Sequence, residues 1–323
     1  ASAVGAIADV VGVPNADRPH DARDLPDADS PEFGAAVNEG SVFGRVVPDQ
    51  KRHMVTAMQD AGHTVAMTGD GVNDVLALKG ADIGIAMGSG SPATRAVAQI
   101  VLLDNRFASL PHVVAEGRRV IANMERVASL FVTKTVYAAI LAVAIGFVGW
   151  AFPLLPRHLT LIGSLTIGIP AFFLSFEPTE EPVRTGAFGR IMRFAVPSGI
   201  VAATAAYGVY SAARAIEGDL TVARSATTIT MVLVGMWILV ELVIPLTPSR
   251  TALVGAMIAA FALTLVVPFG RAFFDLVIPP LDIIAVIAAV TIVAAGVLHV
   301  ALRVVDHHEG SWVPWLGVDE EIG

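Results

Sequence analysis

The segment MTGDGVND, Met67 to Asp74, contains two carboxylates that could hold a metal ion. Asp70 lies between two glycines, and Asp74 follows Asn73. Glycine tolerates the backbone conformations of a tight turn, so these two aspartates, four residues apart around a turn that enters a helix, can face one point. Paired carboxylates with room for water suit Mg²⁺, a hard cation that prefers oxygen ligands. The spacing therefore predicts a magnesium site at Asp70 and Asp74.

Groups that bind phosphate accompany the two aspartates. Lys51, in PDQK, supplies a positive charge, the amide of Asn73 can donate a hydrogen bond, and the backbone turns tightly at Gly71. A lysine, an amide and Mg²⁺ around one crevice form a phosphoryl-transfer site. The alternative is a tight GDG turn in which Asp74 only caps a helix. That alternative suits an isolated GDG better than GDGVND after an apolar strand with PDQK upstream.

Short strands and helices must position these groups, and they alternate along the polar part of the chain. The predicted strands cover residues 41–47, 63–67, 82–87 and 99–103, with helices over 48–62, 72–79 and 92–98. This alternation predicts an α/β fold with a mostly parallel sheet, whose ligands bind beyond the carboxyl ends of the strands. Asp70 lies just beyond the strand 63–67. Residues 15–40 are interpreted as a solvated surface segment, because their acidic residues lack the spacing of a calcium loop.

Composition separates a polar front from an apolar back. Of the 323 residues, 54% are hydrophobic and only 15% are charged, which is too apolar for an ordinary soluble protein. The net charge of −8 argues against a nucleic-acid partner, because there is no basic patch to neutralise phosphates. The absence of cysteine excludes disulfides, thiolate metal sites and cysteine nucleophiles.

A long helical pattern begins near Ser109 and is followed by further apolar runs. We assign residues 1–108 to the α/β domain, 109–126 to a stalk helix, 127–304 to a membrane domain and 305–323 to a cytosolic tail. A span needs roughly 20 apolar residues. The six predicted spans are about 127–151, 158–176, 192–214, 226–246, 251–269 and 281–304. With the α/β domain in the cytosol, six crossings return the C-terminus to the cytosol, and the distribution of arginines supports this weakly.

These residues resemble a known family. MTGDGVNDVLALKGADIGIAMGSG resembles the hinge motif of P-type ATPases, the cation pumps that form an aspartyl phosphate, and FGRVVPDQK resembles the segment before it. The resemblance continues through VLLDNRFASL and EGRRVIANM. It implies a haloacid-dehalogenase-like phosphorylation domain, ATP as substrate and Mg²⁺ as cofactor. Asp70 matches the magnesium-binding aspartate, Asn73 and Asp74 match loop positions that steady phosphate and metal, and Lys51 matches the phosphate lysine.

The sequence departs from the family pattern in three respects. It contains no DKTGT motif with the phosphorylated aspartate, no nucleotide-binding domain and no TGES-type loop. We therefore interpret it as a fragment of a pump, inactive without the N-terminal part of the same protein as its partner. The alternative is a non-enzymatic membrane remnant that binds Mg²⁺ and associates with another subunit. An anchored phosphatase would need its own DxDx nucleophile loop, which the sequence lacks.

The transported cation is less clearly marked. Calcium pumps of this family carry ligands on the spans that correspond to the first two here, and among the matching positions only Thr166 keeps its residue type. Glu241 is a second candidate ligand, since a carboxylate in a membrane helix is costly, although it could instead pair near the interface. Lys134 either extends to the cytosolic surface or acts as an internal counter-charge. We also expect the helix around Gly168 and Pro170 to be locally unwound. The expected membrane partners are lipid and the cation, with Ca²⁺ favoured by the resemblance.

Overall fold

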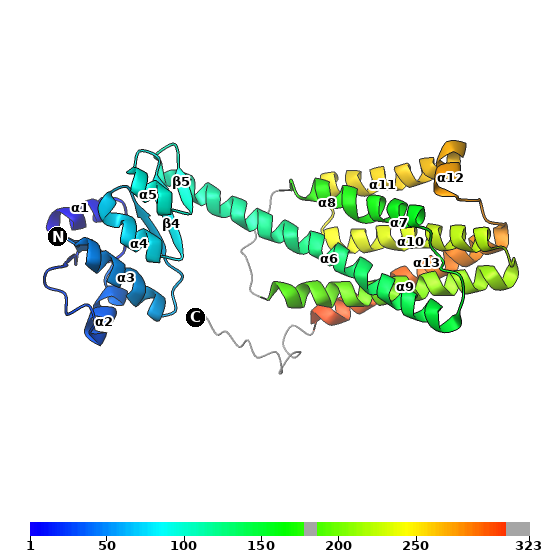
Figure 1. Ribbon diagram of the computed structural model, residues 1–323, viewed down its shortest axis with the longest axis horizontal. Coiled ribbons are helices and arrows are strands. Elements are labelled where there is room, and N and C mark those ends of the chain that lie inside the picture. The colour runs from blue at the N-terminus through cyan, green and yellow to red at the C-terminus, as the bar shows by residue number, and fades with distance from the viewer. Residues whose placement is uncertain (178–185, 308–323) are drawn as a thin grey trace. The chain divides into compact units, whose positions relative to one another are not determined.

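The computed structural model describes residues 1–177 and 186–307 (Figure 1). The chain forms two compact units, which divide between Val113 and Val114. Residues 308–323, most of the expected tail, lie outside the described residues. Each unit is described separately.

The first unit is built around a small parallel sheet, as the sequence predicts. Its three strands lie side by side in the order β3-β4-β5, and all pairs are parallel. These strands are β3 (Ala66–Gly69), β4 (Ile83–Met87) and β5 (Ile100–Leu102), and the helices between them are η1 (Val72–Asp74), α4 (Val75–Gly80) and α5 (Pro92–Val97). Before them come α1 (Ser2–Val10), β1 (His20–Asp21), α2 (Pro31–Glu39), β2 (Phe43–Gly44) and α3 (Pro48–Asp60), and after them η2 (Phe107–Ser109).

Local sequence explains where α3 begins and why β2 is short. Pro48 occupies the first turn of α3, where its missing N–H leaves no hydrogen bond unmade. The side chain of Gln50 accepts a hydrogen bond from the Val47 N–H at 3.2 Å and donates one to the Ala22 carbonyl at 2.7 Å. The predicted strand 41–47 is reduced to two residues paired with β1, because Arg45 has a φ of 61° that extended backbone does not permit.

Residues 15–40, predicted to be a solvated surface segment, are mostly exposed or half-buried, but the segment also contains regular structure and buried residues that the sequence analysis did not predict. They contain β1 and the helix α2, whose first turn is capped where the Phe33 N–H donates to the Ser30 hydroxyl at 3.3 Å. Phe33 and Val37 are buried on one face of α2, and Ala22 is fully buried. The few apolar residues in this acidic stretch are therefore core residues, a role that composition alone does not reveal.

A carboxylate that joins α3 to the start of β3 makes the first unit sensitive to acid. Asp82 Oδ2 accepts hydrogen bonds from the Val65 N–H at 2.8 Å and the Gln59 amide at 3.1 Å. The Val65 N–H and then the Gln59 amide hold the pKa of this carboxyl below its usual range. The stability gained is present above the unfolded-state pKa of about 4 and is lost as the pH falls through the lower folded-state value.

We expect hydrogen-exchange protection of the β3 and β4 amides, corrected for intrinsic rates, to fall between about pH 5 and pH 3 in the wild type. In Asp82→Asn this pH dependence should be weaker, because the titrating group is gone. An unchanged pH dependence in the variant would show that other groups govern acid sensitivity.

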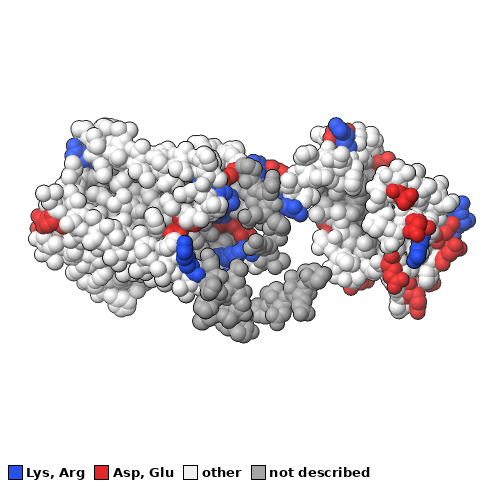
Figure 2. All heavy atoms as spheres, turned by 180° about the vertical axis from the view of Figure 1, so that it is seen from behind, with Lys and Arg blue, Asp and Glu red and all other residues white. Residues whose placement is uncertain are grey.

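The second unit contains six helices in its described ranges that are long and apolar enough to cross a membrane. Most of α6 (Leu110–Val148) belongs to it, followed by a composite helix of α7 (Pro156–Gly163), η3 (Ser164–Gly168) and α8 (Ile169–Leu174). The remaining helices are α9 (Ala187–Ile216), α10 (Leu220–Val243), α11 (Pro248–Val266), the short α12 (Pro268–Phe274) and α13 (Leu281–His307). On the face shown in Figure 2, charged side chains gather at the ends of this unit and leave the part between them uncharged.

Small residues allow the helices of the second unit to approach closely. On α9, Ala202, Ala203 and Ala206 are almost completely buried, in the same core cluster as Met231 and Leu239 of α10. Without a strong hydrophobic drive inside lipid, close backbone packing of this kind holds membrane helices together. The helix α10 is buried on most of its length and forms the centre of the unit.

A polar network ties the helix ends at one side of the second unit. Glu177 follows α8, and its Oε1 accepts a hydrogen bond from Arg250 Nε of α11 at 2.7 Å. Its Oε2 lies 3.8 Å from a guanidinium nitrogen of Arg126 on α6. Arg190 of α9 donates to Glu125 of α6 at 2.6 Å. These contacts fix the relative positions of α6, α9 and α11 at this end.

The structure differs from the expected unwinding near Pro170. Residues Ser164–Gly168 stay helical but widen into a π-helix between α7 and α8. Proline has no N–H to donate to the preceding turn, and a wider turn accommodates the lost bond without opening the backbone. The prediction of an unwound segment is therefore wrong in form, although the irregularity lies in the predicted place.

Candidate functional site

The loop after β3 brings Lys51 and Asp74 together, from elements more than 20 residues apart in the chain. Lys51 Nζ donates to Asp74 Oδ1 at 2.6 Å, and the Gly71 N–H donates to Asp74 Oδ2 at 3.3 Å. Asp74 is buried, whereas Lys51 is about one third exposed. Both oxygens of Asp74 are therefore engaged within the protein, and Oδ1 holds the lysine at the edge of the loop.

The start of helix α5 supports the loop that follows β3 through two hydrogen bonds. The Thr94 hydroxyl donates to the Gly71 carbonyl at 2.9 Å, and the Ser91 N–H donates to the Asp70 carbonyl at 2.9 Å. Thr94 is completely buried and also contacts the Ser91 hydroxyl at 2.6 Å. Sequence reasoning missed both residues. The sequence signal that could have found them was the Ser91-Pro92 pair. This pair is typical of the start of a helix, and it follows β4, the next strand after the loop.

Close packing explains two glycines around the site. A Cβ atom on Gly69 would lie 2.6 Å from Asp74 Cβ, and one on Gly90 would lie 3.1 Å from the Asp70 carbonyl oxygen. Any side chain at Gly69 would therefore displace Asp74. The glycine pattern of the motif reflects this contact as well as the turn itself.

Asp70 and Asn73 face outward from the braced loop. Both are exposed, and neither side chain has a hydrogen-bond partner within the part of the chain that the structure describes. In the same ranges, no three acidic or histidine side chains lie close enough to form a metal cage. The donors fit Mg²⁺, which proteins commonly hold through one or two carboxylates plus water and phosphate oxygens. Asp70 is the carboxylate available to it, while the two oxygens of Asp74 already have protein partners.

The bracing contact predicts a measurable effect at the loop. Thr94→Val removes the hydroxyl that donates to the Gly71 carbonyl and leaves the Asp74 N–H as its donor, and the lost hydrogen bond costs about 1–1.5 kcal/mol. We expect the amides of Asp74 and Val75 to exchange roughly tenfold faster with solvent, because each 1.4 kcal/mol corresponds to a factor of ten. Thr56→Val is the matched control, since the Thr56 hydroxyl bonds only the Arg52 carbonyl of its own exposed helix face. Equal exchange in both variants would contradict a bracing role.

The predicted membrane residues do not share one site. Thr166 is buried, donates to the Ile162 carbonyl at 2.7 Å, and lines a cavity of about 20 Å³ that also contacts Tyr137. Lys134 Nζ lies 3.3 Å from the position of a Cβ on Gly163, so the ammonium lies against the neighbouring membrane helix. Lys134 is half-buried, and both roles expected for it stay predictions.

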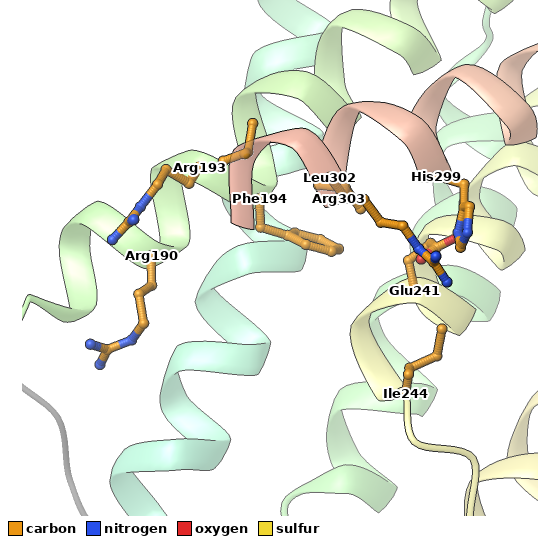
Figure 3. A pocket seen from close by; sticks show the side chains of 9 residues that line it. Arg190, Arg193, Phe194, Glu241, Ile244, His299, Leu302 and Arg303 are labelled. Carbon is orange, nitrogen blue, oxygen red and sulfur yellow. The ribbon is translucent and has the colours of Figure 1, made fainter. Parts of the chain in front are cut away.

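Glu241 lies apart from Thr166, close to the end of α10. Its Oε1 is 2.8 Å from Nδ1 of His299 on α13, and its side chain is 8% exposed. The pair lines a separate pocket of about 360 Å³ (Figure 3). Sequence reasoning missed His299. The only signal was a lone histidine near the end of an apolar span, and nothing in the sequence indicates that α10 and α13 are neighbours.

Comparison with known proteins finds transport ATPases that are similar to this chain over both units. The haloacid dehalogenase-like hydrolase family matches residues 52–114. A calcium-transporting ATPase, CtpE, of Mycolicibacterium smegmatis is 45% identical over 93% of this chain and 39% of its own length. The CtpE of Mycobacterium tuberculosis is 46% identical over 92% of the chain and 39% of its length. A probable cation-transporting ATPase, exp7, of Streptococcus pneumoniae is 42% identical over 53% of the chain and 23% of its length. The chain thus spans less than half of these relatives.

Proposed function

From its homology to the calcium- and cation-transporting ATPases, we propose that this chain is the C-terminal part of an ATP-driven cation pump of the P-type, which works through an aspartyl phosphate. The observation that carries the proposal is that one chain combines a loop suited to phosphoryl transfer with a set of membrane-capable helices. A GDGVND loop lies at the carboxyl end of a parallel strand beside Lys51, and the described residues after it contain six helices capable of crossing a membrane. The 45% identity covers both parts.

In this proposal the loop residues have distinct roles. Asp70 holds Mg²⁺, which neutralises charge on the phosphoryl group when bound. Lys51, held by Asp74 at 2.6 Å, presents its remaining N–H groups to phosphate oxygens, and Asn73 donates from the same loop. The engaged oxygens of Asp74 make it chiefly a residue that positions Lys51 and the turn at Gly71.

The cation and the orientation are part of the same proposal. Ca²⁺ is the proposed cargo, because the most extensive similarities are to proteins named calcium-transporting. The first unit and the C-terminus face the cytosol, where ATP is available. Thr166 contributes a neutral oxygen to the cation path and Lys134 an internal positive charge. Glu241 remains a candidate ligand, although it lines a different pocket from Thr166.

Transport by the full-length protein tests the proposal. The purified protein is reconstituted into vesicles, and uptake is measured with ATP and Mg²⁺ for Ca²⁺, Mn²⁺ and K⁺ separately. We expect ATP-dependent uptake of Ca²⁺, with an acid-stable phosphoenzyme formed in parallel. A protein that forms no phosphoenzyme with any cation would support the non-enzymatic alternative instead.

The role of Glu241 has its own test in the same assay. If Glu241 binds the cation, Glu241→Gln should lower the cation affinity for transport and change its pH profile, because the charged ligand is lost. An unchanged affinity and pH profile would remove Glu241 from the cation site and leave the path to Thr166 and its surroundings.

The 323-residue chain by itself should form no phosphoenzyme, because its sequence contains no DKTGT aspartate to accept the phosphoryl group. The measurement is acid-stable radiolabel on the purified chain after incubation with labelled ATP. Label on this chain would mean that another residue is the nucleophile.

A further inference from the structure

A pocket of about 360 Å³ opens between the start of α9 and the ends of α10 and α13 (Figure 3). Four of its residues are basic and four are apolar, with Glu241 as its single acid. The lining residues are Arg190, Arg193, Phe194, Glu241, Ile244, His299, Leu302, Arg303 and Val305. Neither the phosphoryl-transfer loop nor the cavity at Thr166 shares a residue with it.

The pocket carries an excess of positive charge. Arg193 and Arg303 are exposed, and neither forms an ion pair with any residue in the described ranges. Arg193 donates only to the Gly189 carbonyl of its own helix at 3.3 Å. The acid of the pocket, Glu241, is already engaged by His299 at 2.8 Å. Two arginines are therefore available to an anion, and arginine binds phosphate groups well.

The position along the helices puts these arginines at the level of lipid headgroups. The helix α13 has 27 residues, about 40 Å at 1.5 Å per residue, whereas the hydrocarbon layer is about 30 Å thick. Arg303 lies in its last two turns, and Arg193 lies in the second turn of α9. Basic side chains at this level attract anionic lipids.

Apolar side chains line the same pocket. In Figure 3, Phe194 extends from α9 into the space beside Leu302 and Arg303 of α13. A free phosphate ion would use only the arginines, whereas a phospholipid would use the arginines for its phosphate and the apolar residues for the first carbons of its chains. The mixed lining favours an amphipathic ligand.

We propose that this pocket binds the headgroup of an anionic glycerophospholipid. Its phosphate contacts Arg193 and Arg303, and the chains leave the pocket along Phe194 and Leu302. The bound lipid joins α9 to α13 at the end of the unit where the other polar contacts between helices gather. The inference is independent of the pump activity proposed above.

Thermal unfolding tests the proposal on the 323-residue chain purified in a non-ionic detergent. Phosphatidylglycerol should raise the unfolding temperature by several degrees more than phosphatidylcholine does. The double variant Arg193→Gln/Arg303→Gln should lose more than half of this difference. Arg271→Gln is the matched control, because Arg271 lies in α12, away from this pocket, and it should keep the full difference.

Several results would overturn the proposal. Equal shifts with both lipids, or a full shift in the double variant, would exclude a specific anionic lipid. The same shift with inorganic phosphate alone would show that the pocket takes a soluble anion. If the double variant does not fold, a photoactivatable phosphatidylglycerol is cross-linked to the wild-type chain. Label on peptides around Phe194 and Leu302 supports the site, and label only elsewhere overturns it.

Discussion

If the full-length protein is the proposed pump, Asp70→Ala is expected to lower its rate of phosphoenzyme formation from ATP by about a thousandfold. The outward-facing carboxylate of Asp70 is the ligand available for Mg²⁺, and the metal neutralises charge that develops on the phosphoryl group. Its loss removes on the order of 4 kcal/mol of transition-state stabilisation, and each 1.36 kcal/mol is a factor of ten in rate. The measurement is acid-stable radiolabel as a function of time.

Asp60→Ala is the control for this experiment, because Asp60 is an exposed aspartate at the end of α3 and away from the loop. It should phosphorylate at the wild-type rate. A normal rate in Asp70→Ala would mean that the metal is held elsewhere, and the roles proposed for the loop would have to be revised.

Gly69→Ala, a change of one methyl group, should reduce phosphorylation of the proposed pump by about tenfold to a hundredfold. The new Cβ would lie 2.6 Å from Asp74 Cβ and 2.8 Å from Asp74 Oδ2, so Asp74 must move away from its bond to Lys51. A displaced lysine no longer meets the phosphate, and small misplacements of catalytic groups are costly.

The matched control is Gly80→Ala, because a Cβ there meets no atom within 4 Å and alanine is the better helix former. It should leave phosphorylation unchanged and stability equal or slightly higher. Equal activity of the two variants would show that the Lys51–Asp74 pair tolerates movement.

The proximity of Lys51 and Asp74 could be predicted from sequence because both lie in short motifs, while the chemistry assigned to them stays a prediction. Lys51 and Asp74 were assigned to one crevice from their residue types and from the strand that precedes Asp70, and the structure joins them at 2.6 Å. Thr94 could not be predicted in the same way. Its contact with Gly71 depends on how α5 packs behind the loop, and no local pattern encodes that distance.

The hydrophobic pattern of the sequence predicted the elements whose buried residues recur regularly. It did not predict the elements in which few residues are buried. Continuous apolar runs indicated the parallel strands and the six apolar helices. The helix α2 escaped notice because only Phe33 and Val37 are buried among polar neighbours. Sequence also placed Thr166 and Glu241 in one site, whereas the structure puts them in separate cavities. Which faces of two membrane helices meet is decided by packing and not by composition.

The π-helix at Ser164–Gly168 also sets the rotational phase of the helix that contains it. A π turn holds about one more residue than an α turn, and one residue of an α-helix corresponds to about 100° of rotation. The face that α8 presents to its neighbours is therefore turned by about that angle from the face that a straight continuation of α7 would present. If the same residues formed an ordinary α-helix instead, buried side chains such as Ala171 and Leu174 would turn by about 100° from their present face, whereas deleting one residue together with the π turn would leave them on it. The π turn therefore accommodates one extra residue while α8 keeps the face that packs against its neighbours.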